Sequence, residues 1–140
     1  MMMGNEGSQE ISKEEQYTES AYKPLWGTIV ELFRDDVENW GGDVQMLRLV
    51  EYLADQRYIG SFFPSTQLMR LGISTKPWPE WNRTGFLSIC WDKPQQVFHL
   101  DYSKNAYSKS EDRTCQESEV HDMVELKLLR LWLSASGSAS

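Results

Sequence analysis

Side chains able to do chemistry gather in two neighbouring segments of the chain. These are GFLSICW at 85–91 and QQVFHLDYS at 95–103. Both segments alternate large apolar residues with polar ones, which predicts two half-buried β-strands. A turn at 92–95 would join them into a hairpin with Ile89 opposite Phe98. This register gathers the large apolar side chains on one face, so the pattern and the turn favour the same pairing.

The polar side chains of the two predicted strands share the other face. Ser88 would lie opposite His99, with Cys90 on the diagonal and Asp101 two residues along the same strand. A thiol or hydroxyl, an imidazole and a carboxylate are the parts of a nucleophilic site. Such a site also needs oxyanion donors and a pocket, and no nucleophile elbow or glycine-rich loop is present. Catalysis by Cys90, His99 and Asp101 is therefore the alternative interpretation rather than the main one.

A zinc site is a second use for the same side chains. His99 and Asp101 could begin one, and the further ligands would come from Cys90, Cys115 or His121. The chain holds only 2 histidines and 2 cysteines, and neither CxxC nor HExxH is present. No glycine-rich phosphate loop with a following lysine is present either. We expect no metal and no cofactor.

Helices are predicted on both sides of the hairpin. Apolar residues spaced three and four apart predict helices over 24–40 and 43–56. Thr114 and Glu117 resemble a capping box that opens a last helix ending near Leu133. The apolar stripe expected on the first helix consists of Leu25, Ile29, Leu32, Phe33, Val37 and Trp40.

A further strand is predicted at 66–74, which completes an α+β domain over 22–134. The predicted order is α-α-β-β-β-α, with a three-stranded antiparallel sheet that helices cover on one face. The polar segments 1–21 and 135–140 are expected to be disordered tails. The uncovered face of the sheet would carry Arg70, Phe86, Ser88, Cys90, Val97, His99 and Asp101.

Two tryptophans, Trp78 and Trp81, occupy a predicted loop between prolines and a glycine. One interpretation is that the loop folds over the sheet and the indoles complete the core, since large aromatic side chains are mostly buried. The other is that prolines stiffen the loop and present the indoles to a partner. Tryptophan and arginine are common in binding hot spots, and Arg83 is close by. The sequence leaves both open.

The charge of the chain restricts its partners. The net charge of -7 opposes sequence-independent binding to nucleic acid, which requires clustered lysine and arginine. An acidic surface favours a basic protein partner, and Asp35 and Asp36 form an acidic patch late in the first helix. No apolar run is long enough for a membrane span, and no secretion signal is recognisable. We expect a cytoplasmic protein with free thiols.

These observations favour a small, acidic, non-enzymatic binding protein, such as an inhibitor, an immunity-type protein or an adaptor. One alternative is a small enzyme or ligand-binding protein that uses Cys90, His99 and Asp101. The other is a homodimer, formed through the edge of the strand at 66–74 or through the edge of the third strand, QQVFHLDYS. The expected partner-binding residues are Trp78, Trp81, Arg83, Arg70, His99 and Asp101, with Asp35 and Asp36 as a second patch.

Overall fold

The computed structural model describes residues 21–77, 80, 84–105 and 109–136. These residues form the helices α2 (Lys23–Trp40), α3 (Val44–Ala54) and α5 (Glu117–Ser136) and the short 3-10 helix η1 (Arg57–Ser61). They also form the strands β1 (Phe63–Gln67), β2 (Arg70–Ser74), β3 (Phe86–Asp92), β4 (Val97–Ser103) and β5 (Glu111–Cys115).

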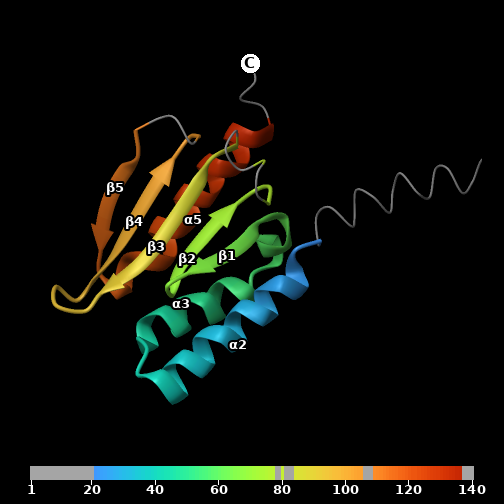
Figure 1. The fold of residues 1–140 in the computed structure, drawn as a ribbon. Coiled ribbons are helices and arrows are strands. Elements are labelled where there is room, and N and C mark those ends of the chain that lie inside the picture. The colour runs from blue at the N-terminus through green and yellow to red at the C-terminus, as the bar shows by residue number, and fades with distance from the viewer. Residues whose placement is uncertain (1–20, 78–79, 81–83, 106–108, 137–140) are drawn as a thin grey trace, which may run out of the picture.

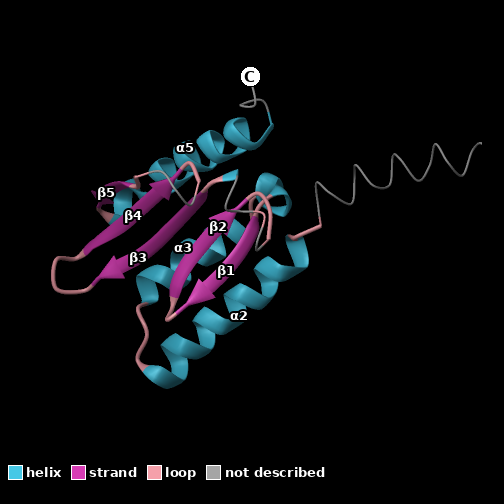
Figure 2. Ribbon diagram, turned by 45° about the horizontal axis from the view of Figure 1, so that its top comes forward, coloured by secondary structure: helices cyan, strands magenta, loops and turns pink. Residues whose placement is uncertain are grey.

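The strands make one antiparallel sheet in the order β1-β2-β3-β4-β5. The expected α+β class is confirmed, but the expected three-stranded sheet is wrong because the sheet is 5-stranded. Figure 1 shows α5 passing behind β3 and β4, while α2 and α3 lie side by side near β1 and β2. Figure 2 shows the same layers from a tilted view, with one broad face of the sheet free of helices.

The first hairpin occupies the segment predicted as a single strand. β1 and β2 are joined at Leu68 and Met69, whose φ angles are 52° and 61°. Hairpin turns with positive φ at both central residues favour Asn-Gly, and a leucine followed by a methionine gives no such signal. Leu71 and Ile73 point into the core, because both side chains are fully buried.

The second hairpin differs from its expected register by two residues. Ile89 pairs with Leu100 rather than with Phe98. The cause is a longer turn, in which Gln96 has a φ of 59° and donates its backbone N–H to the carbonyl of Asp92 at 2.7 Å. Because side chains alternate along a strand, a shift of two leaves every side chain on its expected face.

The last strand lies where the sequence predicted no strand, and it moves the start of the last helix. Thr114 belongs to β5 and pairs with His99, so the expected capping box of Thr114 and Glu117 is wrong. Instead, Glu119 Oε1 accepts a hydrogen bond from the backbone N–H of Gln116 at 3.0 Å. A side chain of α5 thus provides the partner for a backbone N–H at the start of the helix. α5 then continues to Ser136, beyond its expected end.

The core lies between the sheet and the helices. Burial alternates along β4, where Phe98, Leu100 and Tyr102 are buried and the residues between them are not. A sheet with one covered face produces this pattern. The side chains that fill the core from the helices include Trp26, Phe33, Leu49, Leu53, Val124, Leu128 and Leu131.

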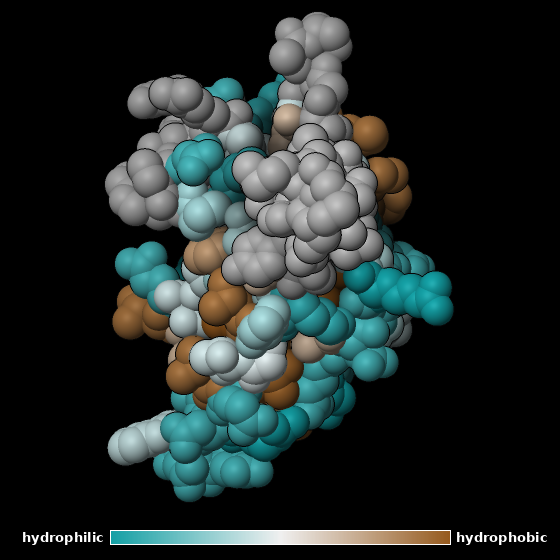
Figure 3. Space-filling model, turned by 90° about the vertical axis from the view of Figure 1, so that its right-hand side faces the viewer, coloured by the Kyte–Doolittle hydropathy of each residue, from teal (hydrophilic) through white to brown (hydrophobic). Residues whose placement is uncertain are grey.

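The buried stripe of α2 is rotated from the expected one. Trp26, Ile29 and Phe33 are buried, whereas Leu32 and Trp40 are exposed by 47% and 77%. The indole N–H of Trp26 donates to the carbonyl of Phe62 at 3.0 Å, which fixes the rotation with a buried hydrogen bond. Figure 3 shows brown apolar side chains among teal ones on the side of the molecule that lies to the right in Figure 1.

α5 also leaves apolar side chains outside the core. Leu126, Leu129 and Leu133 are each more than half exposed, although the helix buries Val124, Leu128 and Leu131 on its other side. Among the described helices, none has the length and apolarity needed to cross a membrane.

Candidate functional site

The uncovered face of the sheet carries a row of small and acidic residues. The register aligns Ser65, Gly72, Ser88, Asp101 and Asp112, one from each strand in sheet order. Because the row crosses all five strands on the side opposite the core, its side chains point away from the helices. The row is therefore small and neutral on β1 to β3 and acidic on β4 and β5.

A second row carries the residues that sequence reasoning singled out. Cys90 pairs directly with His99, and Thr114 lies opposite His99 on its other side. Arg70, at the start of β2, donates its Nε–H to the Ser88 hydroxyl at 3.4 Å. The structure thus brings Arg70, Cys90 and His99 to one face, as expected.

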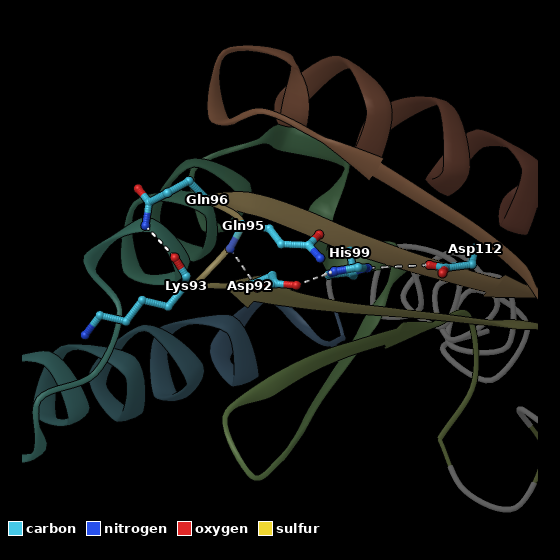
Figure 4. A network of polar contacts seen from close by, with 6 residues as sticks. All are labelled: Asp92, Lys93, Gln95, Gln96, His99 and Asp112. Carbon is cyan, nitrogen blue, oxygen red and sulfur yellow. Dashed lines mark hydrogen bonds and ion pairs between the residues drawn. The ribbon is translucent and has the colours of Figure 1, made fainter.

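His99 lies between two carboxylates (Figure 4). Its Nε2 is 2.9 Å from Asp92 Oδ2, and its Nδ1 is 3.9 Å from Asp112 Oδ1. Asp92 has a second task, because its Oδ1 accepts the backbone N–H of Gln95 at 3.1 Å and so closes the turn. The bonds from His99 and then from Gln95 lower the pKa of the Asp92 carboxyl. His99 is therefore held in place by carboxylates rather than directed at Cys90.

Asp101 and Asp112 face each other across β4 and β5. One oxygen of Asp101, Oδ1, is buried and receives no hydrogen bond from the described residues. The Asp112 side chain is 65% exposed. Two carboxylates opposite each other repel, and a buried oxygen without a donor costs desolvation energy. The repulsion would be relieved by a cation bound at the exposed carboxylate of Asp112.

The candidate catalytic residues are close together but are not connected as a nucleophilic site. Among the described residues Cys90 has no hydrogen-bond partner, and both ring nitrogens of His99 face Asp92 and Asp112. Asp101 lies opposite Ser88, two residues along β4 from His99. The expected pairing of Ser88 with His99 is therefore wrong, for the same reason as the register shift.

The residues considered for zinc are spread over the molecule. Cys115 is buried, and its burial, with a smaller effect from Glu119, raises the pKa of its thiol to about 11. His121 lies on α5 and stacks on Tyr52 with ring centroids 3.7 Å apart. The described residues include no group of three or more histidine, cysteine or acidic side chains arranged to hold a metal ion.

The remaining expected partner-binding residues fall elsewhere. Trp78, Trp81 and Arg83 lie outside the described residues. Asp35 and Asp36 belong to α2 and are not part of the uncovered face; the Asp35 carboxylate accepts a hydrogen bond from Asn39 at 2.6 Å. The acidic patch of α2 is thus separate from the candidate site on the sheet.

Sequence reasoning missed Asp92 and Asp112. Asp92 begins a turn that contains Pro94, and an aspartate that bonds a backbone N–H within such a turn is a known signal that could have identified it. Asp112 gave no signal, because EDRTC in β5 has no alternation of apolar and polar residues. A comparison with protein-family models, curated proteins and solved structures finds no significant match to this chain.

Proposed function

We propose that this chain is a non-enzymatic protein-binding module that docks a basic segment of a partner protein on the uncovered face of its sheet. Asp101 and Asp112 would receive the basic side chain. The observation that carries the proposal is the pair of facing carboxylates of Asp101 and Asp112, of which Asp112 has a side chain that is 65% exposed.

The chemistry of this pair favours a cation. Removing either carboxylate from water costs free energy unless donors replace the lost water, and arginine and lysine supply charged donors. The described residues provide none: no lysine or arginine among them forms an ion pair with Asp101 or Asp112. Three of the described arginines pair with other acids: Arg34 with Glu51, Arg48 with Glu117 and Arg130 with Glu111.

The shape and charge of the molecule favour a protein as the source of that cation. The face is a broad surface of five strands rather than an enclosed cavity, and specific protein interfaces need such an area. The net charge of -7 would speed the approach of a basic surface and would make association depend on salt.

The test is a titration with a capped peptide that carries four arginines, followed by amide NMR. We expect saturable shifts that centre on Asp101 and Asp112. Asp101→Asn together with Asp112→Asn should weaken binding by about tenfold, which corresponds to about 1.4 kcal/mol. The matched control is Asp35→Asn together with Asp36→Asn, which removes the same charge from α2 and should change the affinity by less than about twofold.

Equal loss in both double variants would show that the peptide responds only to net charge, and the proposal would then fail. Shifts confined to α2 and α3 would overturn it as well.

A thiol enzyme is the second candidate function, because Cys90 and His99 are direct neighbours across β3 and β4. It can be distinguished by the rate at which iodoacetamide alkylates Cys90 between pH 5 and 9 in a Cys115→Ala variant. A rate already maximal at pH 6 would indicate an activated thiolate and favour the enzyme. A rate that rises steadily with pH and does not change in His99→Gln would favour the binding protein.

A further inference from the structure

The uncovered face has a hollow on the half opposite the acidic pair. Its volume is about 300 Å³, and it lies over β1, β2 and β3. The residues that line it are Ser65, Gln67, Arg70, Gly72, Phe86 and Ser88, together with Thr66. At this volume the hollow is at the small end of ligand pockets, large enough for one small group.

Gly72 shapes the floor of the hollow. A Cβ added there would lie 2.5 Å from Cζ of Phe86 and 2.6 Å from the Ser65 hydroxyl oxygen. Both distances are shorter than van der Waals contact allows, so any side chain at this position would displace the phenyl ring and the hydroxyl. Because position 72 is a glycine, the side chains of Ser65 and Phe86 can both approach the backbone of β2.

The described residues that line the hollow are mostly hydrogen-bond donors. Arg70 is the only charged residue among them, and the others include the hydroxyls of Ser65 and Ser88 and the amide of Gln67. The only hydrogen bond of its guanidinium within the described residues is the long one from Nε to Ser88, at 3.4 Å. By contrast, Arg48 and Arg130 each bind a glutamate through two nitrogens. Among the residues that the structure describes, Arg70 thus has no partner for its terminal N–H groups, and no acidic residue lines the hollow.

We propose that this hollow binds a single oxyanion group, a carboxylate or a phosphate. The planar guanidinium of Arg70 would hold two oxygens side by side, because its fork matches the spacing of oxygens in both groups. The hydroxyls of Ser65 and Ser88 would donate to the remaining lone pairs, and the Phe86 ring would form the apolar wall. The inference adds to the proposed function without depending on it, since it uses a different half of the face and the opposite charge.

The experiment follows the backbone amides of Gly72 and Ser88 and the side-chain N–H of Arg70 by NMR. The probes are sodium phosphate and sodium acetate, added separately at pH 7 with sodium chloride balancing the ionic strength. We expect saturable shifts with at least one of the two anions. Stronger binding of acetate would assign the site to a carboxylate, and stronger binding of phosphate would assign it to a phosphorylated ligand.

Three variants test the role assigned to Arg70. Arg70→Gln should weaken binding at least about tenfold, and Arg70→Lys should weaken it about fivefold, because lysine keeps the charge but loses the fork. Arg113→Gln is the matched control, since Arg113 is also exposed on a strand and also forms no ion pair among the described residues. It should change the affinity by less than about twofold.

Shifts that do not saturate with either anion, or that persist unchanged in Arg70→Gln, would overturn the inference. The Asp101→Asn and Asp112→Asn double variant keeps the hollow intact and should bind the anions at least as well as the original chain. Failure of the anion site and failure of the basic-partner proposal are therefore separate results.

Discussion

Leu68, Met69 and Gln96 hold positive φ angles of 52°, 61° and 59°. For residues with a Cβ this left-handed conformation costs about 1–2 kcal/mol. Met69 recovers part of that cost, because its side chain packs against the core. Leu68 does not, since its side chain is 92% exposed. The tip of the first hairpin therefore carries uncompensated backbone strain at one residue.

Leu68→Asn should stabilise the protein. Asparagine tolerates the left-handed region better than leucine, and position 68 loses no packing when the side chain changes. We expect the free energy of unfolding to rise by about 0.5–1 kcal/mol, measured by urea denaturation. Leu68→Ala is the control, because it removes the exposed side chain without favouring positive φ. If alanine stabilised as much as asparagine, the gain would come from losing exposed apolar surface and not from the backbone.

The sequence predicted which residues share the uncovered face better than it predicted their partners. Alternation alone placed Arg70, Cys90, His99 and Asp101 correctly, because side-chain direction depends only on position along a strand. Partners depend on turn length, which Gln96 changes by adopting a positive φ. Turn residues of ordinary type give no warning of such a conformation.

Glu111 connects the last strand to the last helix. Its carboxylate accepts two hydrogen bonds from Arg130 on α5, both of 2.9 Å, and Lys127 Nζ lies 3.6 Å away. The Arg130 guanidinium also covers the Tyr102 ring at 4.4 Å from its centroid. β5 has few buried apolar side chains, so this group of charges supplies much of its attachment to α5.

Glu111→Gln should lower stability in a pH-dependent way. The hydrogen bonds from Arg130, followed by the charges of Arg130 and Lys127, lower the pKa of Glu111 to about 2. A carboxyl with a lowered folded-state pKa stabilises the fold above its unfolded pKa of about 4.3, and this contribution is lost as the pH falls toward 2. The original chain should therefore be more stable than the variant at pH 6, and the difference should shrink between pH 4.5 and 2.

Urea denaturation at several pH values measures this difference. Glu38→Gln on α2 is the control, because Glu38 is exposed and forms no ion pair among the described residues. It shows what the loss of one negative charge from an exposed position does to stability over the same pH range. A difference for Glu111→Gln that did not change with pH would show that the ion pair does not contribute.

Elements with an apolar pattern were predicted, and those without one were missed. α2 and α3 were found from the spacing of their apolar residues, but the buried stripe of α2 was misjudged because Leu25 and Leu32 match the same spacing as Trp26 and Phe33. The hydrogen bond from Trp26 to Phe62 favours the face that is buried. β5 had no pattern to find, since only Cys115 of its residues is buried.

The whole molecule places opposite charges on two halves of one face. Arg70 lies on the half formed by β1 to β3, and Asp101 and Asp112 lie on the half formed by β4 and β5. A partner that uses both halves would have to present an acid and a base in a fixed order. Such an arrangement selects for orientation as well as for affinity.

The two edges of the sheet are protected in different ways. β1 contains Pro64, which has no N–H to offer a further strand, and the Tyr22 ring packs against Phe63 with centroids 5.3 Å apart. β5 instead exposes charged residues at Asp112 and Arg113. One dimer expected from the sequence would form through the edge of the segment QQVFHLDYS. This segment contains β4, which has a strand on each side and therefore has no free edge.

Asp112→Thr together with Arg113→Val should allow the β5 edge to pair with a strand of a second molecule. Charged side chains on an edge strand oppose pairing with another sheet, and threonine and valine favour strands. The double variant keeps the net charge, so any association reflects the edge and not a loss of overall repulsion. We expect light scattering to give a larger mean mass for this double variant than for the original chain at equal concentration.

The control is Glu80→Thr with Lys93→Val, which introduces the same residue types at exposed positions outside the strands. Its mean mass should match that of the original chain. Equal masses for all three chains would mean that the geometry of β5, rather than its charge, prevents pairing.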